Sequence, residues 1–216
     1  MNCSLAHGNY LLIGSYSKLY LVDLKNDFAI LGQLHLCRHI FSICAVNWFT
    51  VVCGQQGGQL AAVQIQENAS PPLVKIAEDK VTSGIYKVIR TTQDDFALAC
   101  SGGLYFAKLD PIKRKFTLQE DFLLADHLVT QVYEVSPNKF AVGCWGVPWV
   151  ALVDKVKKTL IKIPCPLPDE TQCTDLLPLP EFDLRSFPVL ILRNSKALNL
   201  VNLSNLTMHR LLMRHN

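Results

Sequence analysis

Charged residues are scarce in this sequence. Asp, Glu, Lys and Arg make up 18% of its 216 residues, whereas hydrophobic residues make up 50%. Such a chain is long enough to bury a real core, and its composition is unlike that of a disordered segment. The formal net charge of +3 is too small to predict nucleic-acid binding from electrostatics alone. We therefore expect a folded chain and no nucleic-acid partner.

Long apolar runs are missing as well. None approaches the ~18 residues that a membrane-spanning helix needs. Residues 1–24 also lack a basic segment followed by an unbroken apolar one, which is the pattern of a secretory signal. We therefore expect a cytoplasmic protein without a transmembrane segment, although a signal ahead of residue 1 would not show in this sequence.

The motifs of common active sites are absent. The sequence contains no Gly-x-Ser-x-Gly, no Gly-x-x-x-x-Gly-Lys and no His-Glu-x-x-His, so it carries none of these nucleophile, phosphate-binding or zinc-protease signatures. The stretch "GQQGGQ" at 54–59 is rich in glycine, but it links two expected strands, and no helix follows it to hold a phosphate. We therefore expect neither a catalytic site nor a cofactor.

Paired cysteine motifs are absent too. The sequence has eight cysteines but no Cys-x-x-Cys, and a chain that is neither short nor visibly secreted gives no reason to expect a disulfide framework. His35, Cys37 and His39 in "HLCRH" are of the residue types that bind zinc. Alternate residues of an extended segment point to the same face, and three ligands spaced in this way rarely converge on one tetrahedral ion. We therefore expect no metal site.

What the sequence does contain is a repeat of roughly 45 residues. Five similar stretches begin at residues 10, 49, 96, 140 and 189, so their starts are 39, 47, 44 and 49 residues apart. Four of the five begin with an aromatic residue, and all continue with small or β-branched apolar residues. They read "YLLIGS", "FTVVCG", "FALACS", "FAVGCW" and "VLILRN".

Further apolar runs accompany each of these stretches. In the third repeat, the four runs are "IYKVIR" at 85–90, "FALACS" at 96–101, "GLYFAKL" at 103–109 and "FTLQEDF" at 116–122. The runs are short, rich in Val, Ile, Leu, Phe and Tyr, and bounded by turn-forming residues, which is typical of strands. No helical spacing is sustained, and 11 prolines are spread along the chain. The pattern therefore predicts four short strands per repeat.

The third run of a repeat ends in an acidic or amide residue in three places. "LVD" ends at Asp23 and at Asp154, and "LVN" ends at Asn202. Four antiparallel strands per ~45 residues, repeated several times, are typical of β-propeller blades. The chain resembles the WD-repeat propellers, whose third strand usually ends in Trp-Asp; here only the Asp is kept, and "AHGN" at 6–9 is a remnant of the family's Gly-His.

We therefore expect an all-β protein, a divergent WD-repeat-like β-propeller of about five four-stranded antiparallel blades. The expected blades cover about 1–34, 40–77, 83–122, 127–163 and 171–212, within a single domain of residues 1–216. Five blades can close a ring by plain packing of the first blade on the last. The chain can also be part of a larger propeller, and the start of the first blade in mid-strand favours this second alternative.

Three cysteines recur at the fifth position of the aligned stretches, namely Cys53, Cys100 and Cys144. A catalytic thiol is not needed in three blades, whereas a small buried residue is needed where inner strands crowd together. We therefore expect these cysteines to be buried. We expect Phe49, Phe96 and Phe140 to pack between blades for the same reason.

The resemblance also implies a binding face. In propellers, the loops between strands two and three gather with the blade-joining segments on one face, which usually binds partners. In this sequence those loops hold several residues of the types enriched at interfaces. Trp145 is the most notable, because a large aromatic residue opening a loop has no obvious core role. The partner-binding candidates are Tyr16, Arg38, Gln55, His127 and Trp145.

We therefore expect a non-catalytic scaffold or regulatory module that binds a protein partner, within a larger complex or attached to another domain. One alternative is a propeller enzyme with an axial active site, which requires His39, Glu78 and His127 to lie within reach of one another. Another alternative is a module that binds phosphoinositides or a membrane surface through "KRK" at 113–115 and "KVKK" at 155–158. Solvated hairpin tips are the simpler interpretation of these two basic runs.

Overall fold

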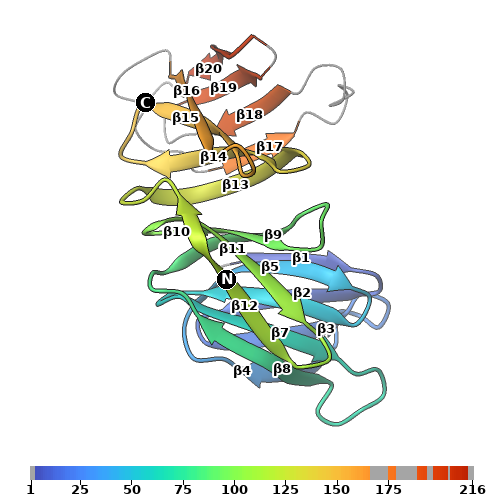
Figure 1. Cartoon of the computed structure of the whole chain (residues 1–216). Helices are drawn as coiled ribbons and strands as arrows, with labels where there is room; N and C mark the ends of the chain where they lie inside the picture. The colour runs from blue at the N-terminus through green and yellow to red at the C-terminus, as the bar shows by residue number, and fades with distance from the viewer. Residues whose placement is uncertain (1–2, 166–174, 179–188, 194–196, 204, 214–216) are drawn as a thin grey trace. The chain divides into compact units, whose positions relative to one another are not determined.

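The computed structural model describes residues 3–165, 175–178, 189–193, 197–203 and 205–213. Twenty β-strands run through these ranges, and no helix occurs in them. The strands form five antiparallel sheets of four strands each (Figure 1). The expectation of an all-β chain built from about five four-stranded antiparallel sheets is therefore confirmed.

Each sheet is an up-and-down meander in which strands that follow each other in sequence are paired. We number the sheets as blades 1 to 5 in chain order. Blade 1 contains β1 (Cys3–His7), β2 (Tyr10–Ser15), β3 (Lys18–Asp23) and β4 (Ile30–His35). Blade 2 contains β5 (Ile40–Asn47), β6 (Thr50–Gln55), β7 (Gln59–Ile65) and β8 (Leu73–Lys80). Blade 3 contains β9 (Ile85–Arg90), β10 (Phe96–Cys100), β11 (Gly103–Asp110) and β12 (Lys115–Leu123).

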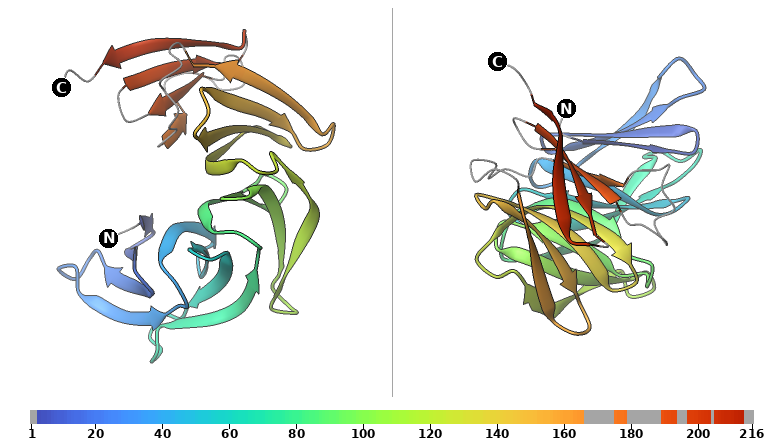
Figure 2. Two further views of the ribbon diagram at one scale, coloured as in Figure 1. Left: turned by 90° about the vertical axis from the view of Figure 1, so that its left-hand side faces the viewer. Right: turned by 90° about the horizontal axis from the view of Figure 1, so that it is seen from above.

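Blade 4 contains β13 (Leu128–Ser136), β14 (Lys139–Trp145), β15 (Trp149–Asp154) and β16 (Thr159–Pro164). Blade 5 contains β17 (Asp175–Pro178), β18 (Val189–Arg193), β19 (Ala197–Asn202) and β20 (Thr207–Met213). The sheets are visibly twisted (Figure 2), as expected from the right-handed twist of strands of L-amino acids.

The chain divides into two compact units. Unit 1 comprises residues 1–100 and 105–121, and therefore blades 1 and 2 with most of blade 3. Unit 2 comprises residues 101–104 and 122–216, and therefore holds blades 4 and 5. A single domain of residues 1–216 stays a prediction.

The second strand is the most buried element of blades 2 and 3. Every residue of β6 and of β10 is buried. The residues of β6 belong to two clusters, one shared with blade 1 and one shared with blade 3, so neighbouring sheets cover both faces of this strand. A strand covered on both faces has no reason to alternate between apolar and polar residues. This explains the continuous apolar runs "TVVCG" and "FALAC".

Two glycines lie where neighbouring blades of unit 1 pack closely. A Cβ atom on Gly14 in β2 would lie 2.6 Å from Cys3 Sγ and 2.9 Å from Ile40 Cγ2 of blade 2. A Cβ atom on Gly54 in β6 would lie 2.6 Å from Ile85 Cγ2 of blade 3. The two glycines occupy the same place in their blades, since each is the penultimate residue of the second strand.

Strand pairing shifts the repeat alignment expected from the sequence. The first strands of blades 2, 3 and 4 pair through Ile40 with Gln55, Ile85 with Cys100, and Val129 with Cys144. Each of these pairs is followed by a break in register, so the three positions are equivalent.

Cys53 is therefore not equivalent to Cys100 and Cys144, but lies two residues earlier in its blade. A shift of two residues keeps a side chain on the same face of a strand, and for this reason Cys53 is still fully buried, like Cys100 and Cys144. The same shift moves Phe49 off the start of β6 into the preceding turn. Phe49 is 50% exposed, whereas Phe96 and Phe140 are 1% exposed, so the expectation that Phe49 packs between blades is wrong.

The acidic residue that ends the third strand shapes the turn that follows. Asp154 Oδ1 accepts hydrogen bonds from the backbone N–H groups of Val156 (3.1 Å) and Lys157 (2.9 Å). Asp110 makes the corresponding bonds in blade 3, and Asp23 and Asn202 each accept one in blades 1 and 5. The backbone bonds from Lys113 and Ile112 help to hold the pKa of Asp110 below its usual value. The residue kept from the Trp-Asp pattern is therefore a turn former.

Replacing Asp154 with Ala is expected to lower the free energy of unfolding by about 1 kcal/mol, because two backbone donors lose their acceptor. Asp154→Asn is the matched control, since an amide oxygen accepts the same bonds and Asn202 occupies the equivalent position. Urea unfolding followed by tryptophan fluorescence measures both. Equal losses for the two variants would contradict the role of the acceptor oxygen.

Burial keeps the repeated cysteines protonated. It raises the pKa values of Cys100 and Cys144 to about 12, and it raises the pKa of Cys53 as well. The thiolate is the reactive form of cysteine, so these three thiols are poor nucleophiles at neutral pH. Cys37 is the contrasting case, because its side chain is exposed.

Brief treatment of the folded chain with iodoacetamide at pH 8 is expected to alkylate Cys37 before Cys53, Cys100 and Cys144. Peptide mass spectrometry at several times reports the order of labelling, and labelling in urea serves as the control for intrinsic reactivity. Early labelling of Cys144 in the folded chain would contradict its burial.

Candidate protein-interaction face

In unit 1, the turns between second and third strands are joined to the blade-connecting segments by backbone hydrogen bonds. Leu36 N donates to Ser17 O at 2.7 Å, and Gln56 N donates to His39 O at 2.8 Å. Val81 N donates to Gly58 O at 3.0 Å. These bonds hold four segments at one end of the strands. We call them the linker face; its segments are residues 15–18, 36–39, 55–59 and 81–84.

Tyr16 lies on the linker face in an unusual backbone conformation. Its φ is +48°, in the left-handed region that residues other than glycine and asparagine rarely adopt. The backbone is held there by the bond from Ile40 N to Tyr16 O, at 2.9 Å. The side chain is nevertheless 66% exposed, so burial of the ring does not offset the cost of this conformation.

An aromatic row extends from Tyr16 across the three blades of unit 1. The Tyr16 and His39 rings meet edge to face with centroids 4.7 Å apart, and the His39 and Phe41 centroids are 6.4 Å apart. Phe41 in turn stacks on Tyr86 of β9, at 5.6 Å and an interplanar angle of 6°. Phe41 is half-buried and Tyr86 is 36% exposed. The row therefore presents aromatic surface from the turn of blade 1 to the first strand of blade 3.

Arg38 and Gln55 are also brought together on this face. Gln55 is fully buried, and its Oε1 accepts a hydrogen bond from Arg38 N at 3.1 Å. The Arg38 side chain is exposed. Gln55 therefore offers no surface to a partner, and its contribution is to position the backbone of Arg38. The equivalent positions in blades 3 and 4 hold Cys100 and Cys144, so the amide is particular to blade 2.

Trp145 and His127 belong to unit 2, at one end of blade 4. Trp145 ends β14, is 45% exposed and precedes Gly146, whose φ is +83°. His127 lies just before β13, with Nδ1 2.8 Å from Ala125 O and its ring 5.3 Å from the ring of Trp149. Lys162 Nζ lies 4.6 Å from the centroid of the same indole, a cation–π geometry.

The sequence did not single out Trp149 or Lys162. Their contact depends on the pairing of β15 with β16, which places Lys162 opposite Ala151. The sequence also did not single out Trp48, which shares the β5–β6 turn with Phe49 and is 70% exposed. The signal for Trp48 was available, because "NWFT" places two bulky residues where a short hairpin turn is expected.

The residues considered for an axial active site are each engaged separately. Glu78 accepts hydrogen bonds from Lys75 Nζ (2.6 Å) and from Cys37 Sγ (3.4 Å). The bond from Lys75 is the main cause of a lowered pKa for Glu78, so this carboxylate is a weak base near neutral pH. His39 belongs to the aromatic row, and His127 lies in the other unit. Among the described residues, no three His, Cys, Asp or Glu side chains are grouped as metal ligands would be.

The described part of the chain contains no helix long and apolar enough to cross a membrane. The basic runs are found in turns between third and fourth strands. Residues 111–114 connect β11 to β12, and residues 155–158 connect β15 to β16. The simpler interpretation of these runs as hairpin tips fits this placement.

Comparison with known proteins shows similarity in fold alone. No protein-family model and no curated protein matches the chain. The β-propeller domain of Cps50 (Swd1) from Myceliophteria thermophila is 12% identical, with a TM-score of 0.63, and the match covers 98% of this chain and 85% of that domain. A chain of the mitotic checkpoint complex is 11% identical, with a TM-score of 0.73, covering 99% of this chain and 64% of that one.

Hydrazine synthase of Kuenenia stuttgartiensis, an enzyme, is 13% identical with a TM-score of 0.67, covering 94% of this chain and 63% of that chain. The chain thus spans less than two thirds of the length of the last two structures. Similarity of this kind does not transfer a function, because one fold hosts many functions. Together with the five four-stranded sheets, it shows that this chain has a divergent, WD-repeat-like β-propeller fold.

Proposed function

We propose that this chain is a non-catalytic protein-interaction module whose linker face binds a protein partner. The observation that carries the proposal is the aromatic row, in which the exposed ring of Tyr16 (66%) meets His39 and the row continues through Phe41 to Tyr86. The positive φ of Tyr16 does not by itself indicate binding, because Phe28 is equally exposed (67%) with a φ of +57°. Binding to a partner provides a reason for keeping exposed aromatic rings side by side on this face.

The surroundings of Tyr16 suit a protein partner. The aromatic row offers rigid apolar surface, and the exposed Arg38 lies on the same face, with its backbone held by Gln55. Tyrosine, tryptophan and arginine contribute most of the binding energy at many interfaces. Loops that are already fixed by hydrogen bonds lose little conformational entropy when a partner binds.

The similar structures support a role within an assembly. One of them is a chain of the mitotic checkpoint complex, which is a protein complex by name. We propose that this chain likewise works in a larger complex or next to an attached domain, and that it does so in the cytoplasm. The enzyme alternative has less support, because Glu78 is paired with Lys75 and is not poised for proton transfer.

Replacing Tyr16 with Ala is expected to reduce the amount of captured partner at least about fivefold, because an interface aromatic is lost. The tagged chain is used as bait in extract from its own cells, and captured proteins are quantified by mass spectrometry. Trp145→Ala is tested separately, since Trp145 lies in the other unit and can serve a different contact.

The matched control is Phe28→Ala, which removes a ring of similar exposure (67%) from the β3–β4 turn, at the other end of the strands of blade 1. Capture that is unchanged in Tyr16→Ala, or equally reduced in Phe28→Ala, would refute the linker face as the binding surface. Absence of any stoichiometric protein with the wild-type chain would refute the scaffold function itself.

A second candidate function is supported by the β11–β12 turn. Ile112 is 91% exposed at its apex, followed by Lys113, Arg114 and Lys115. The bond from Ile112 N to Asp110 Oδ1 (3.0 Å) holds the turn in shape. An apolar side chain beside a cluster of cations suits the surface of an anionic membrane. Val156 is 71% exposed in the corresponding basic turn of blade 4.

If this second function holds, the chain is expected to sediment with vesicles that contain phosphatidylinositol phosphates and not with phosphatidylcholine vesicles. Ile112→Ser then reduces the bound fraction several-fold, while Phe28→Ser does not. Added salt weakens the binding, because charge attraction at a surface is screened. Lack of sedimentation at low salt would eliminate this function.

A further inference from the structure

The β5–β6 turn carries two exposed aromatic residues where turn-forming residues are expected. Asn47 pairs with Thr50, so Trp48 and Phe49 alone form the loop of the hairpin. They are 70% and 50% exposed. Two-residue hairpin loops favour sequences such as Asn-Gly, because the turn types that fit them need positive φ, and neither Trp48 nor Phe49 has one. Local turn preference therefore does not explain this pair of residues.

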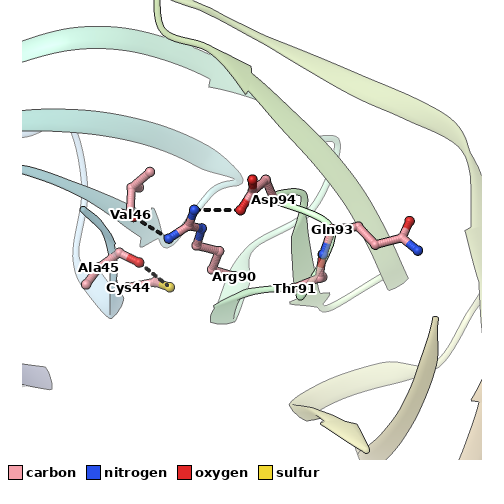
Figure 3. A network of polar contacts seen from close by, with 7 residues as sticks. All are labelled: Cys44, Ala45, Val46, Arg90, Thr91, Gln93 and Asp94. Carbon is pink, nitrogen blue, oxygen red and sulfur yellow. Dashed lines mark hydrogen bonds and ion pairs between the residues drawn. The ribbon is translucent and has the colours of Figure 1, made fainter. Parts of the chain in front are cut away.

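Neighbouring strands hold the backbone of this turn in place. His7 Nε2 of blade 1 lies 2.9 Å from Asn47 O and donates to it. Arg90 of blade 3 donates from Nη1 to Val46 O, and Asp94 pairs with the same guanidinium (Figure 3). Ile65 N of β7 donates to Phe49 O at 2.7 Å. The carbonyl groups at 46, 47 and 49 are thus each bound from a different strand.

Side-chain contacts add to this fixation. Phe49 N donates to Asn47 Oδ1 at 2.9 Å, which stabilises the turn internally. The Trp48 ring rests on Gly8, where a Cβ atom would lie 2.8 Å from the indole. The His7 ring lies 5.6 Å from the indole centroid. One side of the indole is therefore supported by the β1–β2 turn of blade 1, and the remainder faces solvent.

The charges at this turn favour a protein over a lipid surface. The cation that binds the turn, Arg90, is paired with Asp94, whereas the β11–β12 turn has three consecutive cations next to Ile112. A turn without an excess of positive charge gains little from anionic lipid. Two bulky rings on a fixed hairpin form a convex surface, which requires a concave and largely apolar surface on the partner.

We propose that the Trp48–Phe49 turn is a second interaction site, which inserts its two rings into an apolar pocket of a protein partner. The site is distinct from the linker face. Phe49 and Gln56 flank opposite ends of β6, a strand of six residues, so the two sites are about 20 Å apart at ~3.3 Å per residue. One chain can thus hold two proteins at once and bring them together.

The first step of the test is site-specific photocrosslinking of the full chain in its own cells. Phe49 is replaced by p-benzoylphenylalanine, an aromatic analogue that keeps the ring on the turn. The matched control carries the same group at Ile112, which is also exposed at a hairpin turn. A protein crosslinked from position 49 and not from position 112 is expected. No such protein, or a product that is two copies of this chain, overturns the proposal.

The second step is calorimetric titration of the purified crosslinked protein with three forms of the chain. Trp48→Ala is expected to raise Kd at least about tenfold, as loss of a central interface tryptophan does. Tyr16→Ala is expected to leave Kd within about twofold, because the linker face is not used. An unchanged Kd in Trp48→Ala overturns the proposed site. An equal loss of affinity in Tyr16→Ala overturns the claim that this site is separate from the linker face.

Two further measurements keep the outcomes distinct. Phe49→Ser is titrated in parallel, and thermal unfolding of every variant shows whether a lost affinity reflects a lost fold. Vesicles of phosphatidylserine and phosphatidylcholine test the lipid explanation. If the vesicles bind the wild-type chain and do not bind Trp48→Ala, the turn is a membrane-binding site. That result would overturn the proposal that it inserts into a pocket of a protein.

Discussion

The close approach of neighbouring sheets is the constraint on which the rest of this structure depends. Within unit 1, the first strand of one blade packs directly on the second strand of the blade before it, and Gly14 and Gly54 mark the places where no side chain fits. Because β6 is then covered on both faces, every one of its residues is buried. Exposed side chains are found in the turns and along fourth strands such as β4 and β16. The candidate sites of this chain lie mainly in the turns and in the segments that connect the blades.

Much of the fold was predictable from the sequence, because strand runs, turn residues and a period of roughly 45 residues leave few alternatives. Register was less predictable. The alignment of Cys53 with Cys100 and Cys144 was off by two residues, and the pairing of Ile40 with Gln55 reveals it. A shift of two is nearly invisible in sequence, because side-chain orientation in a strand repeats every two residues. Its effect appears only at the strand end, where Phe49 falls into a turn.

The candidate site was predictable in the same uneven way. The surface positions of Tyr16 and Arg38 were predictable, because the repeat locates the turn that holds Tyr16 and the blade-connecting segment that holds Arg38. The positive φ of Tyr16 suits the two-residue loop that Tyr16 and Ser17 form between paired strands. The burial of Gln55 does not follow from the sequence, because it depends on the surrounding chain, including the backbone of Arg38. Likewise, the contact of Lys162 with Trp149 joins residues on paired strands. Sequence periodicity locates turns, whereas the conformation within a turn is decided by partners distant in the chain.

The fixation of the β5–β6 turn also has a mechanical consequence. His7 and Arg90 reach the turn from the blades on either side, so its backbone carbonyls connect three sheets. Elsewhere these sheets meet through apolar packing and a few further hydrogen bonds, such as that from Val88 N to Ser42 Oγ. Apolar packing resists compression well but slides under shear, whereas directional hydrogen bonds resist sliding. Blade 2 is therefore linked by hydrogen bonds to both other sheets of unit 1 at this turn. Displacement of blade 1 or blade 3 along its strands breaks one of these bonds.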